Sequence, residues 1–143
     1  GKACQERTYL GDLMGAAAKA IGFNGIVCDG FVRDRLGLEE LGMPIFSRGF
    51  MQRTPSKKGP GKINTPITCG GVEVHPGDLV LGDADGVTVV PKEIIEAVLA
   101  KAEEKLEYEK NRRIRIAEYA KAREEGRELP DLAPGWVREM LGR

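Results

Sequence analysis

Short apolar blocks alternate with polar or glycine-rich stretches along the first part of the chain, and a charged pattern with helical spacing follows them. The alanine-rich block 13–20, preceded by Gly11-Asp12, predicts a helix that ends near Gly22. The apolar run 25–29 predicts a short buried strand. We expect Asp29-Gly30 to close that strand with a turn.

The next elements follow from the same kind of pattern. A turn and a short helix are expected at 32–41, and residues 44–46 predict a second strand. A helix between two strands at this spacing indicates a βαβ unit. The stretch 53–62 is polar and rich in proline and glycine, so it predicts a loop.

Four more short strands and one long helix are predicted after this loop. Glycine-containing dipeptides separate the four strands, as tight turns require: Ile67-Thr68, Val72–Val74, Leu79–Leu81 and Val87–Val90. The long helix runs from Pro91 to about Glu125, and its apolar positions concentrate in its first half. Gly126 fits a helix end, and a small apolar patch around Trp136 follows it.

Charge and composition narrow the class of protein. The chain has 143 residues, with 22 basic and 22 acidic side chains and no net charge. A chain without excess positive charge is not a general nucleic-acid binder. It also contains no apolar run of about 20 residues, which a membrane-spanning helix would need. We therefore expect neither a nucleic-acid partner nor a membrane.

The nucleophilic and metal-binding residue types are sparse. The three cysteines (Cys4, Cys28 and Cys69) are far apart in the sequence, which disfavours a disulfide framework and favours a reducing, cytoplasmic setting. His75 is the single histidine and is expected in a turn. One histidine excludes any mechanism that needs two.

Candidate chemistry concentrates at two places in the chain. Gly11, Asp12, Leu13 and Met14 stand where the first helix begins, and free N–H groups at a helix start can hold a carboxylate. The segment 29–34 follows the first strand, at the end of a strand where ligands bind in open α/β sheets.

Three charged residues in that segment have distinct chemistry. Arg33 can grip a carboxylate and a keto oxygen together. Asp34 offers hard oxygen ligands that suit Mg²⁺ or Mn²⁺ with several waters. Asp29 has two equal alternatives: it supports Arg33, or it accepts hydrogen bonds from the N–H groups of its own turn. From composition alone, a helix cap at Asp12 and a surface ion pair at Arg33–Asp34 would suffice.

The order of these residues resembles the RraA-like family, which includes the class II 4-hydroxy-4-methyl-2-oxoglutarate/4-carboxy-4-hydroxy-2-oxoadipate aldolases. Asp12, twenty intervening residues and Arg33-Asp34 reproduce the family's D-x20-R-D pattern. The segments GDLMGAAAKAIGFNGIVCDGFVRD (11–34), GMPIFSRG (42–49) and GGVEVHPGDLVLGDADGVTVVP (70–91) are also similar to that family. The resemblance covers roughly residues 8–100.

The resemblance implies a role for each candidate residue. The backbone amides of Gly11, Asp12, Leu13 and Met14 would bind the substrate carboxylate. Arg33 would contact the substrate and stabilise the enolate. Asp34 would be the direct ligand of the divalent metal, and Asp12 would position metal-bound water. No Schiff-base lysine is then needed, and Lys19 is expected to face solvent.

The resemblance also implies a fold and an assembly. The expected fold is the swivelling β/β/α domain, similar to phosphohistidine domains, with a long C-terminal helix. We expect residues 1–106 to correspond to the catalytic domain without its N-terminal portion, and residues 107–143 to form a charged helical extension. Family members are trimers or dimers of trimers, so a homotrimer or homohexamer with sites between subunits is expected.

The function implied by the resemblance is a lyase reaction. It is the metal-dependent retro-aldol cleavage of a 4-hydroxy-2-oxo dicarboxylic acid to pyruvate through an enolate. Oxaloacetate decarboxylation passes through the same enolate and is expected as a side activity. The alternative is a non-catalytic regulator, since the family's namesake inhibits ribonuclease E by protein–protein contact.

Overall fold

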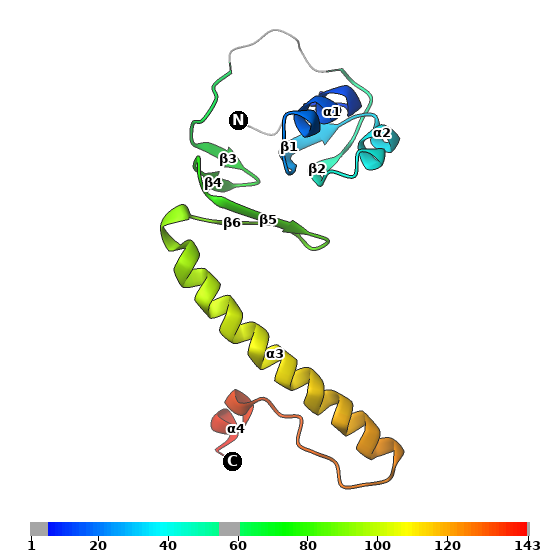
Figure 1. Cartoon of the computed structure of the whole chain (residues 1–143), viewed down its shortest axis with the longest axis vertical. Helices are drawn as coiled ribbons and strands as arrows, with labels where there is room; N and C mark the ends of the chain where they lie inside the picture. The colour runs from blue at the N-terminus through cyan, green and yellow to red at the C-terminus, as the bar shows by residue number, and fades with distance from the viewer. Residues whose placement is uncertain (1–5, 55–60, 143) are drawn as a thin grey trace. The chain divides into compact units, whose positions relative to one another are not determined.

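The structure is a computed structural model that describes residues 6–54 and 61–142 (Figure 1). Contacts divide the chain into two compact units, Gly1–Ile95 and Glu96–Arg143. The first unit mixes helices and strands, and the second is helical. The predicted α/β class and the long C-terminal helix are confirmed. None of the described helices is long and apolar enough to cross a membrane.

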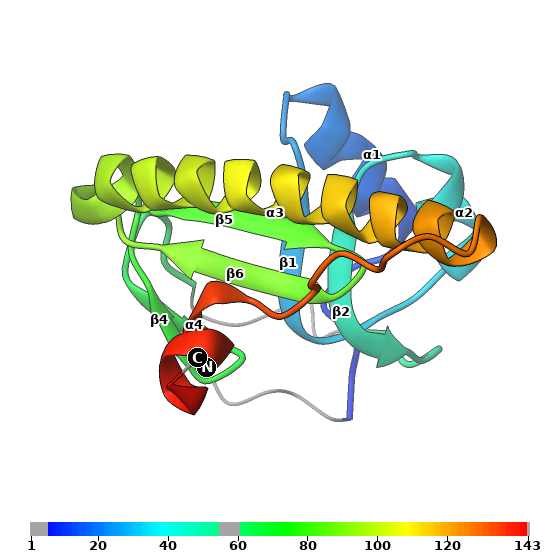
Figure 2. The ribbon, with the colours of Figure 1, turned by 90° about the horizontal axis from the view of Figure 1, so that it is seen from below.

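The first half of the first unit is a βαβ unit. Helix α1 (Asp12–Ala20) is followed by β1 (Ile26–Val32), α2 (Arg35–Glu40) and β2 (Ile45–Phe50). Strands β1 and β2 lie side by side (Figure 2). They pair in parallel, with Ile26 opposite Ile45. The predicted helices and the predicted βαβ connection are therefore confirmed.

Strand β1 differs from its prediction, because Asp29-Gly30 is not a turn. The strand continues through both residues to Val32. Its register with β2 shifts between Cys28 and Phe31, so one extra residue of β1 bulges out of the ladder. Gly30 allows the close approach of Tyr9, whose ring would overlap any side chain at position 30. The glycine that predicted a turn thus forms a bulge.

Two antiparallel hairpins make up the rest of the first unit (Figure 1). Strands β3 (Ile67–Cys69) and β4 (Val72–Val74) form one, and β5 (Leu79–Asp83) and β6 (Gly86–Val90) form the other. The turn between β3 and β4 places Gly70 and Gly71 at φ 59° and 86°, where side chains are disfavoured. All four predicted strands are confirmed.

A small apolar core anchors the segments that lead into the candidate site. Leu10, Val32 and Leu38 are buried, and Ile45 is among the partly buried side chains that pack on them. Leu10 directly precedes the start of α1, and Val32 ends β1. Burial of Leu10 and Val32 therefore fixes the backbone position of the residues that directly follow them, Gly11 and Arg33.

The second unit contains the long helix. A 3₁₀ turn, η1 (Lys92–Ile94), precedes α3 (Ile95–Glu124). Gly126, two residues after α3, has φ 65° and fits the predicted helix end. Helix α4 (Gly135–Leu141) carries the predicted apolar patch, of which Trp136 is largely exposed. The division after residue 106 concerns the family's catalytic domain and stays a prediction.

Candidate active site

The start of α1 and the end of β1 lie side by side. The N–H of Tyr9 donates to the carbonyl of Phe31 at 2.8 Å, and the N–H of Arg33 donates to the carbonyl of Leu10 at 3.0 Å. These two hydrogen bonds align the chain before α1 with the end of β1. The structure thereby brings together the two segments that the sequence singled out.

Arg33 and Asp34 form a partly exposed ion pair at this junction. The Arg33 Nη1 and Asp34 Oδ2 atoms are 2.5 Å apart, and each side chain is 34% exposed. The Arg33 Nε is buried and has no hydrogen-bond partner among the described residues. A buried donor without a partner costs about 1–3 kcal/mol. Arg33 therefore has a hydrogen-bond donor that no described residue uses.

The backbone of Asp34 is unusual. It has φ 59° and ψ 50°, in the left-handed region that few residues other than glycine adopt. Its side chain does not cap α2, and among the described residues its Oδ1 atom accepts no hydrogen bond. One carboxylate oxygen is thus engaged by Arg33, and the other is available to a ligand.

Gly11 has a steric role in addition to its predicted backbone role. A Cβ atom at this position would lie 2.8 Å from Arg33 Cζ and would overlap the Asp34 carboxylate. Side chains do not approach so closely, so only glycine admits the ion pair against the start of α1. Substitution here would displace both charged groups.

The first turn of α1 offers backbone donors. The Leu13 N–H donates to Asp12 Oδ1 at 2.7 Å, and the Gly15 N–H donates to the Gly11 carbonyl. The N–H groups of Gly11, Asp12 and Met14 have no partner among the described residues. The Leu13 side chain is 78% exposed, so this end of the helix is open to a ligand. Three of the four predicted amide donors therefore have no partner among the described residues.

A divalent metal would meet few protein ligands here. Across residues 6–54 and 61–142, no group of three or more histidine, cysteine, aspartate or glutamate side chains is arranged to hold a metal ion. The free Asp34 oxygen and the nearby Asp12 carboxylate are hard donors. Such a set fits Mg²⁺ or Mn²⁺, which keep several waters and need only one or two carboxylates.

Asp29 does not take either of its two predicted roles. Its Oδ1 atom lies 2.5 Å from Arg48 Nε on β2, in an ion pair across the parallel strands. The hydrogen bond from Arg48, followed by one from the Gly70 backbone, lowers the pKa of Asp29. Asp29 therefore ties β1 to β2 and to the β3–β4 turn. The sequence did not indicate Arg48, because the bulge in β1 sets its position.

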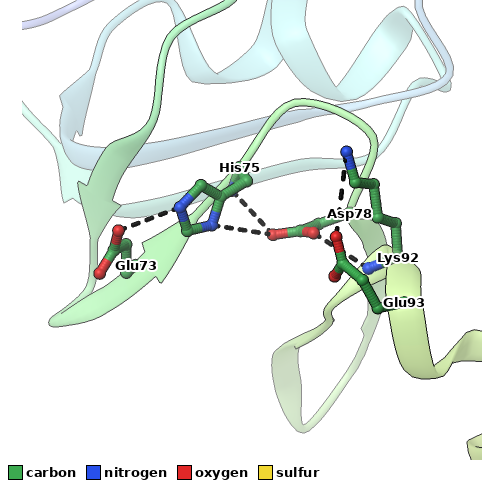
Figure 3. Close-up of polar contacts among 5 residues, drawn as sticks. All are labelled: Glu73, His75, Asp78, Lys92 and Glu93. Carbon is green, nitrogen blue, oxygen red and sulfur yellow. Dashed lines mark hydrogen bonds and ion pairs between the residues drawn. The ribbon is translucent and has the colours of Figure 1, made fainter.

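His75 is a turn residue, as predicted, and a polar cluster surrounds it (Figure 3). Its carbonyl accepts from Asp78 N–H, and its Nε2 is 3.0 Å from Glu73 Oε1. Asp78, only 3% exposed in its side chain, accepts from the backbone N–H groups of His75 (2.7 Å) and Lys92 (3.1 Å). These two hydrogen bonds lower the pKa of Asp78, and the bond from His75 has the larger effect. Asp78 thus ties the β4–β5 turn to η1, which the sequence did not predict.

Neither Lys19 nor Cys28 is placed as a nucleophile of this site. Lys19 is exposed, as expected, and its Nζ donates to the Leu41 carbonyl. Burial raises the pKa of the Cys28 thiol, so the neutral thiol prevails near pH 7. The groups that carry charge at the junction are Arg33, Asp34 and Asp12.

Fold and junction together define an α/β protein in which the start of a helix lies beside an arginine–aspartate pair. The chain belongs to the RraA-like family, because the model of that family, described as Aldolase/RraA, matches residues 1–89. It is 50% identical over 99 residues to a protein of Halalkalibacterium halodurans provisionally named 4-hydroxy-4-methyl-2-oxoglutarate aldolase. That alignment covers 69% of this chain and 47% of the relative.

Other relatives agree on the family and on the fold. A Shewanella oneidensis protein with the same provisional name is 34% identical over 89 residues, covering 62% of this chain and 54% of the relative. The structure of Streptomyces coelicolor RraAS2, described as an unusual member of the RNase ES inhibitor RraA protein family, superposes with a TM-score of 0.74. The two chains are 33% identical, and the match covers 80% of this chain and 59% of the Streptomyces coelicolor chain. This chain spans about half the length of the curated relatives it matches.

Proposed function

We propose that this chain carries the site of a metal-dependent aldolase, which cleaves a 4-hydroxy-2-oxo dicarboxylic acid to pyruvate through an enolate. The observation that supports this most is the Arg33–Asp34 pair held against the start of α1, with an unpartnered Arg33 Nε and a free Asp34 oxygen. The provisional names of two curated relatives support the lyase class.

Substrate binding would use the first turn of α1. The unpartnered N–H groups of Asp12 and Met14 would receive the carboxylate next to the keto group, aided by the positive end of the helix dipole. Arg33 would donate to the keto oxygen. The guanidinium then lies where negative charge grows as the enolate forms, so it stabilises the transition state more than the substrate.

The cleavage reaction needs neither an oxidant nor a covalent intermediate on the protein. The 4-hydroxyl would give its proton to a water molecule of the site and become a carbonyl, the C3–C4 bond breaks, and its electron pair moves into the enolate of pyruvate. Protonation at C3 then gives pyruvate. In oxaloacetate the same bond change releases CO₂ and leaves the same enolate.

Asp34 would hold the divalent cation through its free oxygen, and Asp12 would position a water molecule beside it. The cation, when bound, supplies Lewis-acid stabilisation of the developing enolate charge. Arg33 holds the second Asp34 oxygen and so fixes the direction of the carboxylate.

The test measures pyruvate release from oxaloacetate and from 4-hydroxy-4-methyl-2-oxoglutarate, with Mg²⁺ and then with EDTA. Arg33→Ala is expected to lower turnover by roughly 10²–10³-fold, since a charge-stabilising donor is removed. Arg35→Ala is the matched control, because Arg35 is exposed and pairs with Glu39. Asp34→Asn is expected to abolish both the rate and the metal dependence. Equal loss in Arg33→Ala and Arg35→Ala would contradict the proposed site.

A second function is favoured by a separate observation. The Streptomyces coelicolor structure, whose description refers to RNase ES inhibition, resembles this chain at a TM-score of 0.74. A regulator that inhibits a ribonuclease E-type enzyme by protein contact is therefore the alternative. It predicts that the purified chain slows RNA cleavage by ribonuclease E, and that Arg33→Ala leaves this inhibition unchanged. Metal-dependent pyruvate release without such inhibition would reject the alternative.

A further inference from the structure

Helix α2 packs against the first turn of α1 at a position occupied by glycine. Gly37, in the middle of the six-residue helix α2, faces Asp12, the first residue of α1. Glycine inside a helix is less favourable than alanine by roughly 1 kcal/mol. Gly37 has no positive φ that would require glycine on backbone grounds. The reason for glycine at this position therefore lies in what it touches.

The three nearest atoms in this contact all belong to Asp12. A Cβ atom at position 37 would lie 2.8 Å from Asp12 Cβ, 3.0 Å from Asp12 Oδ2 and 3.3 Å from Asp12 Cγ. The closest of these atoms is next to the backbone of α1 and cannot swing aside as the end of a long side chain can. Any side chain at position 37 must therefore displace the Asp12 carboxylate or the start of α1.

The Asp12 carboxylate accepts a single hydrogen bond among the described residues. Its Oδ1 accepts from the Leu13 N–H at 2.7 Å, and its Oδ2 accepts no hydrogen bond from them. The direction of Oδ2 is thus set by one backbone hydrogen bond and by the space that Gly37 leaves. A carboxylate that positions a water molecule needs this kind of fixed direction with one oxygen free.

We infer that Gly37 is a positioning residue of the active site, which sets the direction of the Asp12 carboxylate by having no side chain. This inference rests on the proposed function for its effect on catalysis. Its effect on Asp12 itself does not depend on that function. The two parts can therefore be measured separately on the full chain.

The first measurement is structural. The ¹H–¹⁵N resonance of Leu13 reports the hydrogen bond to Asp12 Oδ1, so Gly37→Ala is expected to shift it. Glu40→Ala, an exposed change in the same helix, is expected to leave it in place. A Leu13 resonance that does not move in Gly37→Ala overturns the inference, whatever the activity of the chain.

The second measurement is catalytic, with oxaloacetate and Mg²⁺. Gly37→Ala is expected to lower kcat by about tenfold or more with little change in KM, because a misplaced catalytic group slows the reaction more than it weakens binding. Alanine raises the helix propensity of α2, so a merely structural role would not lower kcat in this pattern.

The double variant decides whether Gly37 acts through Asp12. If it does, Gly37→Ala has no further effect in the Asp12→Ala background, since the misplaced carboxylate is already gone. An equal loss in both backgrounds overturns the inference. Absence of turnover in the unmodified chain rejects the proposed function, and a shifted Leu13 resonance would still show that Gly37 positions Asp12.

Discussion

Two glycines shape the charged centre of the candidate site. Gly11 leaves room for the Arg33–Asp34 pair, and Gly37 leaves room for Asp12. The charged residues themselves were predictable, since the D-x20-R-D order appears in the sequence. Gly37 was not, because nothing in the chain order shows that α2 packs on the first turn of α1. A spacing pattern identifies reactive groups, whereas the space around them depends on tertiary contacts.

The buried carboxylate of Asp78 is expected to stabilise the β4–β5 turn. It accepts two backbone hydrogen bonds, from His75 and Lys92 (Figure 3). Asp78→Ala leaves both donors without partners and is expected to lower Tm. Asp85→Ala, a change at the exposed β5–β6 turn, is the control and should have a smaller effect. Equal Tm values for the two variants would show that the Asp78 bonds do not hold the turn.

The titration of Asp29 is expected to make the stability of the chain depend on pH. Its pKa is lowered in the folded chain, chiefly by the hydrogen bond from Arg48. A lowered folded-state pKa adds stability above the unfolded-state pKa, and that stability is lost as the pH falls through the folded-state value. Asp29→Asn should therefore flatten the loss of Tm between about pH 5 and pH 2. An unchanged acid limb in thermal unfolding would contradict this assignment.

At the scale of elements, the turns were more predictable than the strand lengths. Gly70-Gly71 and the other dipeptides marked the hairpins because they need backbone conformations that glycine adopts. Asp29-Gly30 carries the same signal, yet it forms a bulge within β1. Asp29-Gly30 stays within the strand because β1 pairs with β2 on one side and Phe31 of β1 bridges to Thr8 on the other. Such pairing partners are distant in sequence, so local pattern cannot reveal them.

The contact between β5 and β2 gives a prediction of its own. A Cβ atom at Gly82 would lie 2.5 Å from the Phe46 ring, so Gly82→Ala overpacks this contact. We expect a loss of about 1–3 kcal/mol in the free energy of unfolding. Gly61→Ala is the matched control, because nothing lies within 4 Å of a Cβ atom there. Urea unfolding compares the two variants, and equal midpoints would show that β5 does not rest on Phe46.

At the scale of the whole molecule, the chain buries little apolar surface for its length. Six hydrophobic residues are buried among those that the structure describes. Large apolar side chains stay exposed in both compact units, including Val80 on β5 and Leu106 on α3. Where such side chains form a contiguous patch, contact with another polypeptide is one use of it. The α/β class followed from element order, but the amount of uncovered surface could be seen only in the structure.

Helix α3 provides the last prediction, on self-association. Its apolar residues Val98, Leu99 and Leu106 are all partly exposed, at spacings that share one helix face. Each is about half exposed, so burying the rest of it against a second copy would contribute about 1 kcal/mol. The RraA-like family resemblance implies a homotrimer or homohexamer, so we expect light scattering to give a mass of three or six times 15.6 kDa. Leu106→Glu should lower that mass, while Glu103→Gln should not. A monomer for the unmodified chain at micromolar concentration would reject the expected assembly, and an oligomer insensitive to Leu106→Glu would place the interface away from α3.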